Sequence, residues 1–250
     1  MKPLYEDPWF TFRFADDRII PRFHLDGVSA HRRISVFKID PTTGERLELL
    51  ATATVGEAGW VDLPQPIIVR AGDAFIAVPA MPPIIRPETQ ADHEAIRHVN
   101  RLAFGRDAEA RLVVALRLGG YVRASLVAEK DEQVVGHILF SDLPIITGDG
   151  TVPALSLAPM AVLPEFQNQG IGSALVREGL AICRAQGHRA VVVLGHPHFY
   201  ERFGFSANLA RRLKSPYAGE AFMAVELVAG ALDGVTGRVQ YPPPFEECLE

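Results

Sequence analysis

The segment Val78–Pro87 constrains the fold of this chain more than any other, because it contains four prolines within ten residues. Proline lacks the backbone N–H that a helix or an inner strand needs, and it holds the preceding residue in an extended conformation. Neither a helix nor a central strand is therefore expected to run through this segment. The sequence predicts a small domain over residues 1–80, a proline-rich linker over 81–87, and a larger domain over 84–250.

The composition excludes several classes of protein. With 250 residues, 48% of them hydrophobic, and a net charge of −5, the chain can bury a core and is not expected to be disordered. The acidic balance does not favour nucleic acid as a partner. No run of 18 apolar residues occurs and the first residues include acids, so we expect neither a membrane span nor a secretory signal. Two cysteines are too few for a disulfide framework, which favours the cytoplasm.

The first eighty residues alternate apolar and polar side chains as β-strands do. RISVFKID and RLELLATATV alternate with period two and are separated by Pro41–Gly44, which predicts a hairpin turn. We therefore expect a small all-β sandwich or barrel. Aromatic residues gather at Trp9–Phe14 and Phe23, and an alternating aromatic strand is more often core than a binding surface. Two alternatives remain open for this N-terminal domain: it could recognise a protein, sugar or peptide, or it could form a homodimer interface.

The larger part mixes helices with strands. Apolar spacing predicts a helix from Asp92 to Phe104 and a second helix after Asp107. The buried face of the first helix is expected to hold Ile96, Val99, Leu102 and Ala103. SLVAE and QVVGHILFS predict a hairpin, ALSLAPMAVL a strand, Gly170–Gln186 a helix, AVVVL a strand, and AFMAVEL the last strand. This order, with a single β-α-β crossover, predicts an α+β fold rather than a doubly wound sheet.

The stretch from Met160 to Leu175 is the most informative about function. An apolar strand stops at Pro164, and a short polar loop leads into a helix whose first turn holds Gly170 and Gly172. The first N–H groups of a helix have no intrahelical partner, and the helix dipole adds positive charge there. Glycines let an anion approach this backbone closely. The pattern indicates a phosphate-binding loop, although close packing of helix and strand is a structural alternative.

Two familiar phosphate-binding motifs do not fit this loop. A dinucleotide fingerprint needs a third glycine where Leu175 stands, and no acid ends the following strand AVVVL. A Walker loop needs Gly-Lys-Ser/Thr, whereas Ser173 and Ala174 follow Gly172 here. Neither motif fits, so the loop is either another type of anion site or a helix start that uses glycine for close packing against a strand.

Three segments together resemble the GNAT superfamily of N-acetyltransferases. Gln167-x-x-Gly170-x-Gly172 after Ala161-Val162-x-Pro164 is similar to its acyl-CoA signature, and Tyr200 four residues before Gly204-Phe205 is similar to its next landmark. Ile85-Arg86-Pro87 followed by Asp92–Ile96 resembles its first strand and helix. The likeness covers residues 84–246, and segments such as Arg212–Tyr217 and Tyr241–Pro243 resemble its YhbS-like branch. It implies a mixed sheet with flanking helices.

The resemblance implies acetyl-CoA as co-substrate and a small-molecule or peptide amine as acceptor. The backbone amides that would hold the pyrophosphate belong to Gln167, Asn168, Gln169, Gly170, Ile171, Gly172 and Ser173. The pantetheine arm would run along Met160, Ala161 and Val162, in a strand splayed from AVVVL so that the thioester reaches the gap. Direct transfer to an amine expels a thiolate, and Tyr200 matches the tyrosine that protonates it. Its alternative role is an aromatic side chain that caps the sheet.

Other candidate residues carry weaker signals. The titratable groups expected near the strand ends, and therefore candidates for the general base, are His137, Glu165, His196 and Glu201. His196 and His198 are too few to predict a metal site. Cys183 is expected to be a small core residue and Cys248 to lie in a frayed tail. A second hypothesis remains beside the enzyme: an acyl-CoA sensor that uses the N-terminal domain to recognise a partner.

Overall fold

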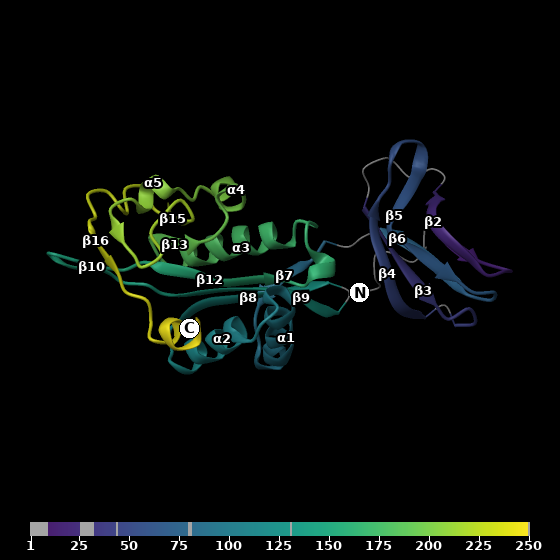
Figure 1. Cartoon of the computed structure of the whole chain (residues 1–250), viewed down its shortest axis with the longest axis horizontal. Coiled ribbons are helices and arrows are strands. Elements are labelled where there is room, and N and C mark those ends of the chain that lie inside the picture. The colour runs from purple at the N-terminus through teal and green to yellow at the C-terminus, as the bar shows by residue number, and fades with distance from the viewer. Residues whose placement is uncertain (1–9, 26–32, 44, 80–81, 131, 250) are drawn as a thin grey trace. The chain divides into compact units, whose positions relative to one another are not determined.

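A computed structural model describes residues 10–25, 33–43, 45–79, 82–130 and 132–249. The chain divides into two compact units, Met1–Pro82 and Pro83–Glu250, which are described separately below (Figure 1). No helix among the described residues is long and apolar enough to span a membrane.

The N-terminal unit is built from two antiparallel sheets. Its strands are β1 (Phe10–Arg13), β2 (Arg18–His24), β3 (Arg33–Ile39), β4 (Arg46–Thr54), β5 (Trp60–Val69) and β6 (Ala74–Pro79). One sheet has the order β1-β6-β3-β4, and β2 pairs with β5 in the other. The predicted hairpin is confirmed, since β3 and β4 pair around the turn that follows Ile39. The all-β class of this unit is also confirmed.

Phe12, Phe14 and Phe23, from the aromatic segments of the N-terminal unit, pack inward. Phe12 and Phe23 lie 5.4 Å apart, centroid to centroid, and both pack against the core around Leu25 and Ile34. Phe14 makes a similar contact with Phe75. Trp9, which belongs to the same aromatic segment, lies outside the described residues. These phenylalanine rings therefore contribute to the core, as the alternation predicts, whereas Trp60 is 42% exposed.

The second unit is organised around a six-stranded mixed sheet with the order β15-β13-β12-β9-β8-β7. The strands are β7 (Ile84–Pro87), β8 (Val122–Lys130), β9 (Gln133–Asp142), β12 (Leu155–Val162), β13 (Ala190–Leu194) and β15 (Phe222–Glu226). Within the described part of this sheet, β12 and β13 are the only parallel neighbours, and helix α3 (Ile171–Ala185) connects them. The predicted α+β class and its single β-α-β crossover are confirmed. The last residues of the proline-rich segment form β7 at the sheet edge, where proline is tolerated.

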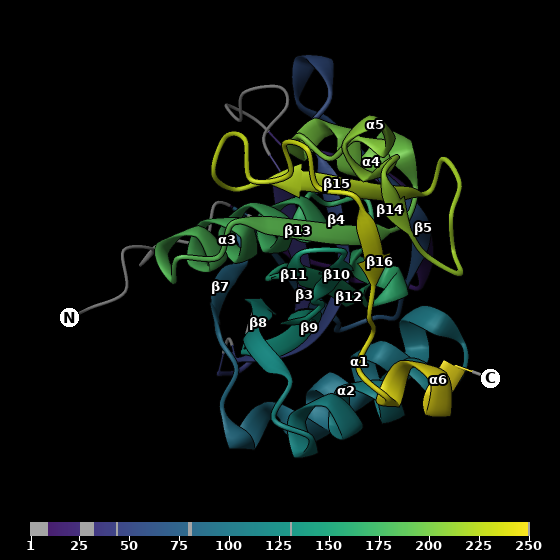
Figure 2. The ribbon, with the colours of Figure 1, turned by 90° about the vertical axis from the view of Figure 1, so that its left-hand side faces the viewer.

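Helices cover both faces of this sheet (Figures 1 and 2). Helices α1 (His93–Phe104), α2 (Ala108–Leu118) and α6 (Pro244–Leu249) lie on one face. Helix α3, the short helix α4 (Pro197–Tyr200) and α5 (Ala207–Ala210) lie on the other. Cys183 is fully buried in α3, and burial raises the pKa of its thiol to about 12, which suits the expected core role.

The N-terminus of α1 shows how sequence sets the start of a helix. Thr89 and Asp92 form a reciprocal capping box around the 3₁₀ turn Gln90–Asp92, which leads directly into α1, and in it the Asp92 carboxylate accepts from the Thr89 N–H at 2.7 Å. The expected buried face needs one correction, because Leu102 is 47% exposed. Asn100 is buried instead, since it follows Ile96 at the i+4 position and donates to its carbonyl oxygen at 2.9 Å.

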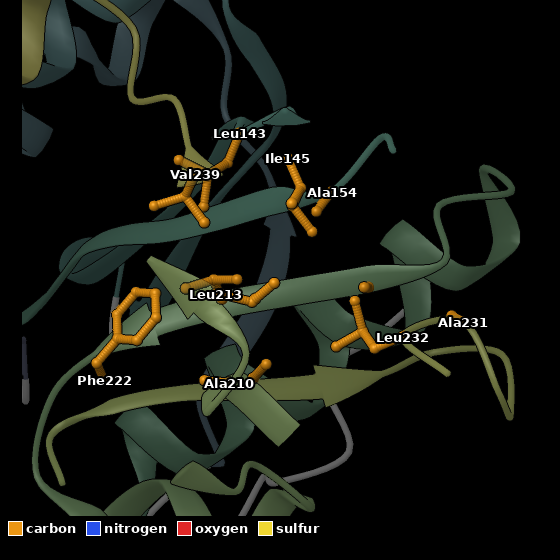
Figure 3. Close-up of a cluster of buried hydrophobic side chains, with 12 residues drawn as sticks. Leu143, Ile145, Ala154, Ala210, Leu213, Phe222, Ala231, Leu232 and Val239 are labelled. Atoms are coloured by element: carbon orange, nitrogen blue, oxygen red, sulfur yellow. The ribbon is translucent and has the colours of Figure 1, made fainter. Parts of the chain in front are cut away.

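A second, smaller sheet extends the core beyond the predicted elements. Its strands are β10 (Ile145–Thr147), β11 (Gly150–Val152), β14 (Leu213–Lys214) and β16 (Gly237–Val239). Buried apolar side chains join it to β13 and β15 in one cluster, which includes Ile145, Leu213, Phe222 and Val239 (Figure 3). The sequence-based assignment of AFMAVEL as the last strand is wrong, because β16 and α6 follow it. Cys248, expected in a frayed tail, packs on the core beside α2.

Candidate active site

A cavity of about 1140 Å³ opens where two parallel strands part. The pairing of β12 with β13 runs from Leu155–Val191 to Leu157–Val193 and ends there. Beyond a bulge after Leu157, residues Met160–Val162 pair with β9 on the other side. The opposite backbone edge of Met160–Val162, on the side of β13, is therefore available to a ligand. The two strands separate here, as expected from the sequence.

The loop between β12 and α3 forms one end of this cavity. A short 3₁₀ turn, Pro164–Phe166, follows the strand, and the Gln167 side-chain amide donates to the Val162 carbonyl oxygen at 3.1 Å. Asn168 and Gly170 have positive φ angles of 58° and 84°, which turn the chain sharply into the helix. The sequence thus closes the loop tightly enough to present the first turn of α3 to the cavity.

The first turn of α3 has the properties of an anion site. Gly170 is the N-cap, and no side chain caps the helix. Because the amides of a first turn lack intrahelical acceptors, they and the dipole make this end positive. A Cβ atom at Gly172 would lie 3.4 Å from the Phe199 ring and 3.5 Å from the Met160 sulfur, so glycine at this position leaves the space beside the backbone open to the cavity. Arg202, which the sequence reasoning missed, donates to Ser173 Oγ at 3.4 Å.

The structure gathers most of the residues implied to bind the cofactor around this one cavity. The lining includes Met160, Ala161, Val162, Gln167, Asn168, Gly170, Ile171, Gly172 and Ser173. Gln169 turns away toward the Glu165 carbonyl oxygen at 2.9 Å and Lys130 Nζ at 3.4 Å. Its contacts therefore support the shape of the loop.

Tyr200 also lines the cavity, from the helix that follows β13. Its ring lies between Phe199 and Phe205, with centroids 4.9 and 5.5 Å away. The missing side chain of Gly195 makes room for this ring against the end of β13. Burial raises the pKa of the Tyr200 phenol to about 12. The phenol is protonated at neutral pH, as an unperturbed tyrosine also is, and therefore carries a proton that it can donate.

The four candidate bases have different surroundings. His196 is exposed and lines the cavity. Glu165 and Glu201 are exposed elsewhere on the unit. His137 is fully buried, and its ring nitrogens contact Asn100 Nδ2 at 3.2 Å and Ser125 Oγ at 3.0 Å. Burial lowers the pKa of His137 to about 4, so this side chain is a neutral part of the core.

Sequence reasoning assigned no role to the residues at the other end of the cavity. The lining there includes Ala103, Phe104, Arg106, Glu109, Leu112, Tyr217, Tyr241 and Phe245. They come from α1, α2 and the C-terminal part of the chain, which are distant in sequence. The available signal was an acidic residue in the first turn of α2, but such a residue also stabilises a helix dipole and is not specific.

Fold and site together define an acetyltransferase. A family model described as "Acetyltransferase (GNAT) domain" matches residues 84–207, the part of the chain that holds the β12–β13 pair, the start of α3 and Tyr200. Over 165 residues the chain is 39% identical to the uncharacterized N-acetyltransferase YhbS of Escherichia coli K12, covering 65% of this chain and 98% of YhbS. The chain belongs to the GNAT family of acetyltransferases, which confirms the resemblance.

Other relatives give the same result. The uncharacterized N-acetyltransferase YjhQ of Escherichia coli K12 is 40% identical over 119 residues, covering 46% of this chain and 65% of YjhQ. The crystal structure of Escherichia coli YhbS with CoA has a TM-score of 0.63 and 38% identity, covering 67% of this chain and 94% of that one. A Brucella melitensis GNAT acetyltransferase with acetyl-CoA has a TM-score of 0.55 and 37% identity, covering 65% and 97%.

Proposed function

We propose that this chain binds acetyl-CoA in the cavity between β12 and β13 and transfers its acetyl group directly to a primary amine. The observation that carries the proposal is the gap in which strand pairing stops after Leu157 while Tyr200 and the first turn of α3 line the same cavity. The complexes of YhbS with CoA and of the Brucella melitensis protein with acetyl-CoA support the choice of ligand.

The phosphates of CoA suit the loop end of the cavity. The amides of Ile171, Gly172 and Ser173 form the positive end of α3, and glycine at position 172 leaves the backbone accessible. The Arg202 guanidinium adds a positive charge beside Ser173. The pantetheine arm would then bond the free backbone edge of Met160–Val162 as an additional strand does.

The reaction needs a neutral amine and a stabilised leaving group. The amine nitrogen attacks the thioester carbon, the C–S bond of the tetrahedral intermediate breaks, and CoA leaves as a thiolate. A backbone N–H of Met160–Val162 would polarise the carbonyl oxygen, as in other oxyanion sites. Tyr200 would donate its proton to the thiolate, and the attacking nitrogen would release its excess proton as the amide forms, which restores the phenol through solvent.

The amine must lose a proton before it attacks. Among the four bases considered, His196 has the position for this role, because it lines the cavity at the end of β13. An imidazole accepts protons readily near neutral pH. We therefore assign His196 as the base that accepts the proton of the substrate ammonium group, directly or through a water molecule.

The decisive experiment compares Tyr200→Phe with wild type in an assay of CoA thiol release with a panel of primary amines. Loss of the proton donor should lower kcat about 100-fold while the Kd of acetyl-CoA changes little. Tyr121→Phe is the matched control, because Tyr121 is half-buried in the core beside α2. Equal kcat in Tyr200→Phe and wild type would remove Tyr200 from the mechanism.

Ligand stabilisation separates the enzyme from the acyl-CoA sensor. Acetyl-CoA at about 100 times its Kd should raise the free energy of unfolding by about 2.7 kcal/mol. Stabilisation without thiol release for any amine would favour the sensor. No stabilisation by acetyl-CoA or CoA would contradict both functions.

A further inference from the structure

A carboxylate lies in the wall of the cavity opposite the loop end. Glu109, in the first turn of α2, is only 6% exposed and lines the cavity together with Phe104 and Leu112. A buried carboxylate loses its hydration and needs a cationic or hydrogen-bonding partner. The proposed transfer chemistry leaves this carboxylate without a role.

The partner of Glu109 leaves part of the carboxylate available. Arg106 Nε lies 3.1 Å from each carboxylate oxygen, and within the described residues Arg106 is the only side chain that pairs with Glu109. The Arg106 side chain is itself 60% exposed, so solvent screens its charge. A carboxylate offers about four acceptor sites, and one guanidinium does not fill them. Glu109 can therefore accept a further donor from the cavity.

Aromatic rings form the rest of this end of the cavity. The rings of Tyr217 and Tyr241 lie 5.7 Å apart, and those of Tyr241 and Phe245 4.9 Å apart. Phe104 and Tyr217 remain 41% and 39% exposed although they line the cavity. Exposed aromatic rings beside a carboxylate suit a cation attached to an apolar body, because apolar contact and cation–π attraction add to the charge pairing.

The two ends of the cavity lie on different faces of the sheet. Helices α1, α2 and α6 cover one face, and α3 and α4 cover the other (Figures 1 and 2). The lining residues come from both sets of helices and from the strands between them. A ligand at Glu109 therefore approaches the gap from the face opposite the first turn of α3.

We infer that Glu109 binds the ammonium group of the acceptor, and that the aromatic wall of Phe104, Tyr217, Tyr241 and Phe245 selects an amine carried on an apolar or aromatic body. This inference rests on the proposed acetyl transfer and adds the class of acceptor. Glu109 holds the cation before the reaction, and the proton leaves the amine afterwards as described above.

A purely structural ion pair at the start of α2 makes a different prediction. Glu109 lies in the first turn of α2 and Arg106 lies in the loop just before it, so the pair could serve only to hold that loop against the start of the helix. In that case, substitution of Glu109 or of Arg106 would lower the stability of the protein by the same amount and leave the KM for the amine unchanged. If Glu109 binds the substrate, the two substitutions should change the KM for the amine in opposite directions.

The experiment uses 2-phenylethylamine as the apolar probe and ethanolamine as the small hydrophilic probe, with CoA thiol release as the readout. We expect kcat/KM to be at least tenfold higher for 2-phenylethylamine. Glu109→Gln should raise the KM for 2-phenylethylamine at least tenfold with the Kd of acetyl-CoA unchanged, and Glu109→Asp should restore part of the loss. Arg106→Gln should lower this KM, because it removes a competing cation.

Glu94→Gln is the matched control, since Glu94 is an exposed acid in the first turn of α1 and should leave the KM unchanged. An unaltered KM in Glu109→Gln, or equal use of the two amines, would overturn the inference while acetyl transfer stands. Acetyl-CoA binding without transfer to any amine would instead overturn the proposed function and the inference with it. Retained stabilisation by acetyl-CoA shows that each variant is folded.

Discussion

Gly195, at the end of β13, provides the space that the ring of Tyr200 occupies. A Cβ atom at this position would lie 2.3 Å from Tyr200 Cε2 and 2.9 Å from Cδ2. Non-bonded carbon atoms prefer separations of about 3.5 Å or more, so Gly195→Ala must move the ring by about 1 Å. The substitution therefore displaces the proposed proton donor without changing its chemistry.

The displacement has a predictable magnitude. A misplacement of about 1 Å in a reacting group lowers the rate about 100-fold, which we expect in the kcat of CoA thiol release. Overpacking at a buried site destabilises a protein by about 1–3 kcal/mol. Because each kcal/mol lowers Tm by about 2–4 °C in a chain of this size, Gly195→Ala should remain folded at 25 °C.

Gly119→Ala provides a matched steric control. A Cβ atom at Gly119 would lie 2.4 Å from Cε2 and 2.6 Å from Cδ2 of Tyr121, a ring in the core beside α2. It should lower Tm by a similar amount and leave kcat within about threefold of wild type. Equal activity of Gly195→Ala and Gly119→Ala at 25 °C would refute the requirement for an exactly placed Tyr200 ring.

Three further predictions test other parts of the structure. The methyl group of Gly172→Ala fits at ordinary contact distances, so Tm should stay the same, but it stands where the ligand approaches the backbone, so the Kd of acetyl-CoA measured by calorimetry should rise at least tenfold. The control Gly148→Ala places its methyl group in open space and should change neither Tm nor Kd. Burial lowers the pKa of His137 to about 4, while the unfolded chain binds this proton below about 6.5. The free energy of unfolding should therefore fall as the pH drops from about 6.5 to about 4, and urea titrations should show a shallower fall in His137→Gln. Asp92→Asn should destabilise the protein by about 1–2 kcal/mol in the same titrations, because Asp92 closes the capping box with Thr89 just before α1 and pairs with Arg86, and an unchanged midpoint would contradict this.

The parts of the fold that sequence predicted are those that depend on local patterns. The β3–β4 hairpin follows from period-two alternation on both sides of a turn, and the strand before α3 and the start of that helix follow from Pro164 and Gly170. Each of these features is specified within a few residues of the chain. The same locality explains why the implied loop residues fall around one cavity.

Features that depend on distant partners could not be predicted in this way. Strand β10 has three residues and pairs with β16, about ninety residues later, so neither has a strong pattern of its own. Asn100 is buried because it meets His137 from β9, a polar contact that apolar periodicity does not detect. Glu109 and Tyr241 meet at the cavity only through tertiary packing of α2 against the C-terminal segment.

A crystal structure of the protein with CoA tests the central claim most directly. We expect phosphate oxygens at the amides of Gly172 and Ser173, and the CoA sulfur in the gap beyond Leu157, about 3 Å from the Tyr200 hydroxyl. A CoA molecule bound elsewhere, or one whose sulfur lies outside the gap and far from Tyr200, would contradict the account.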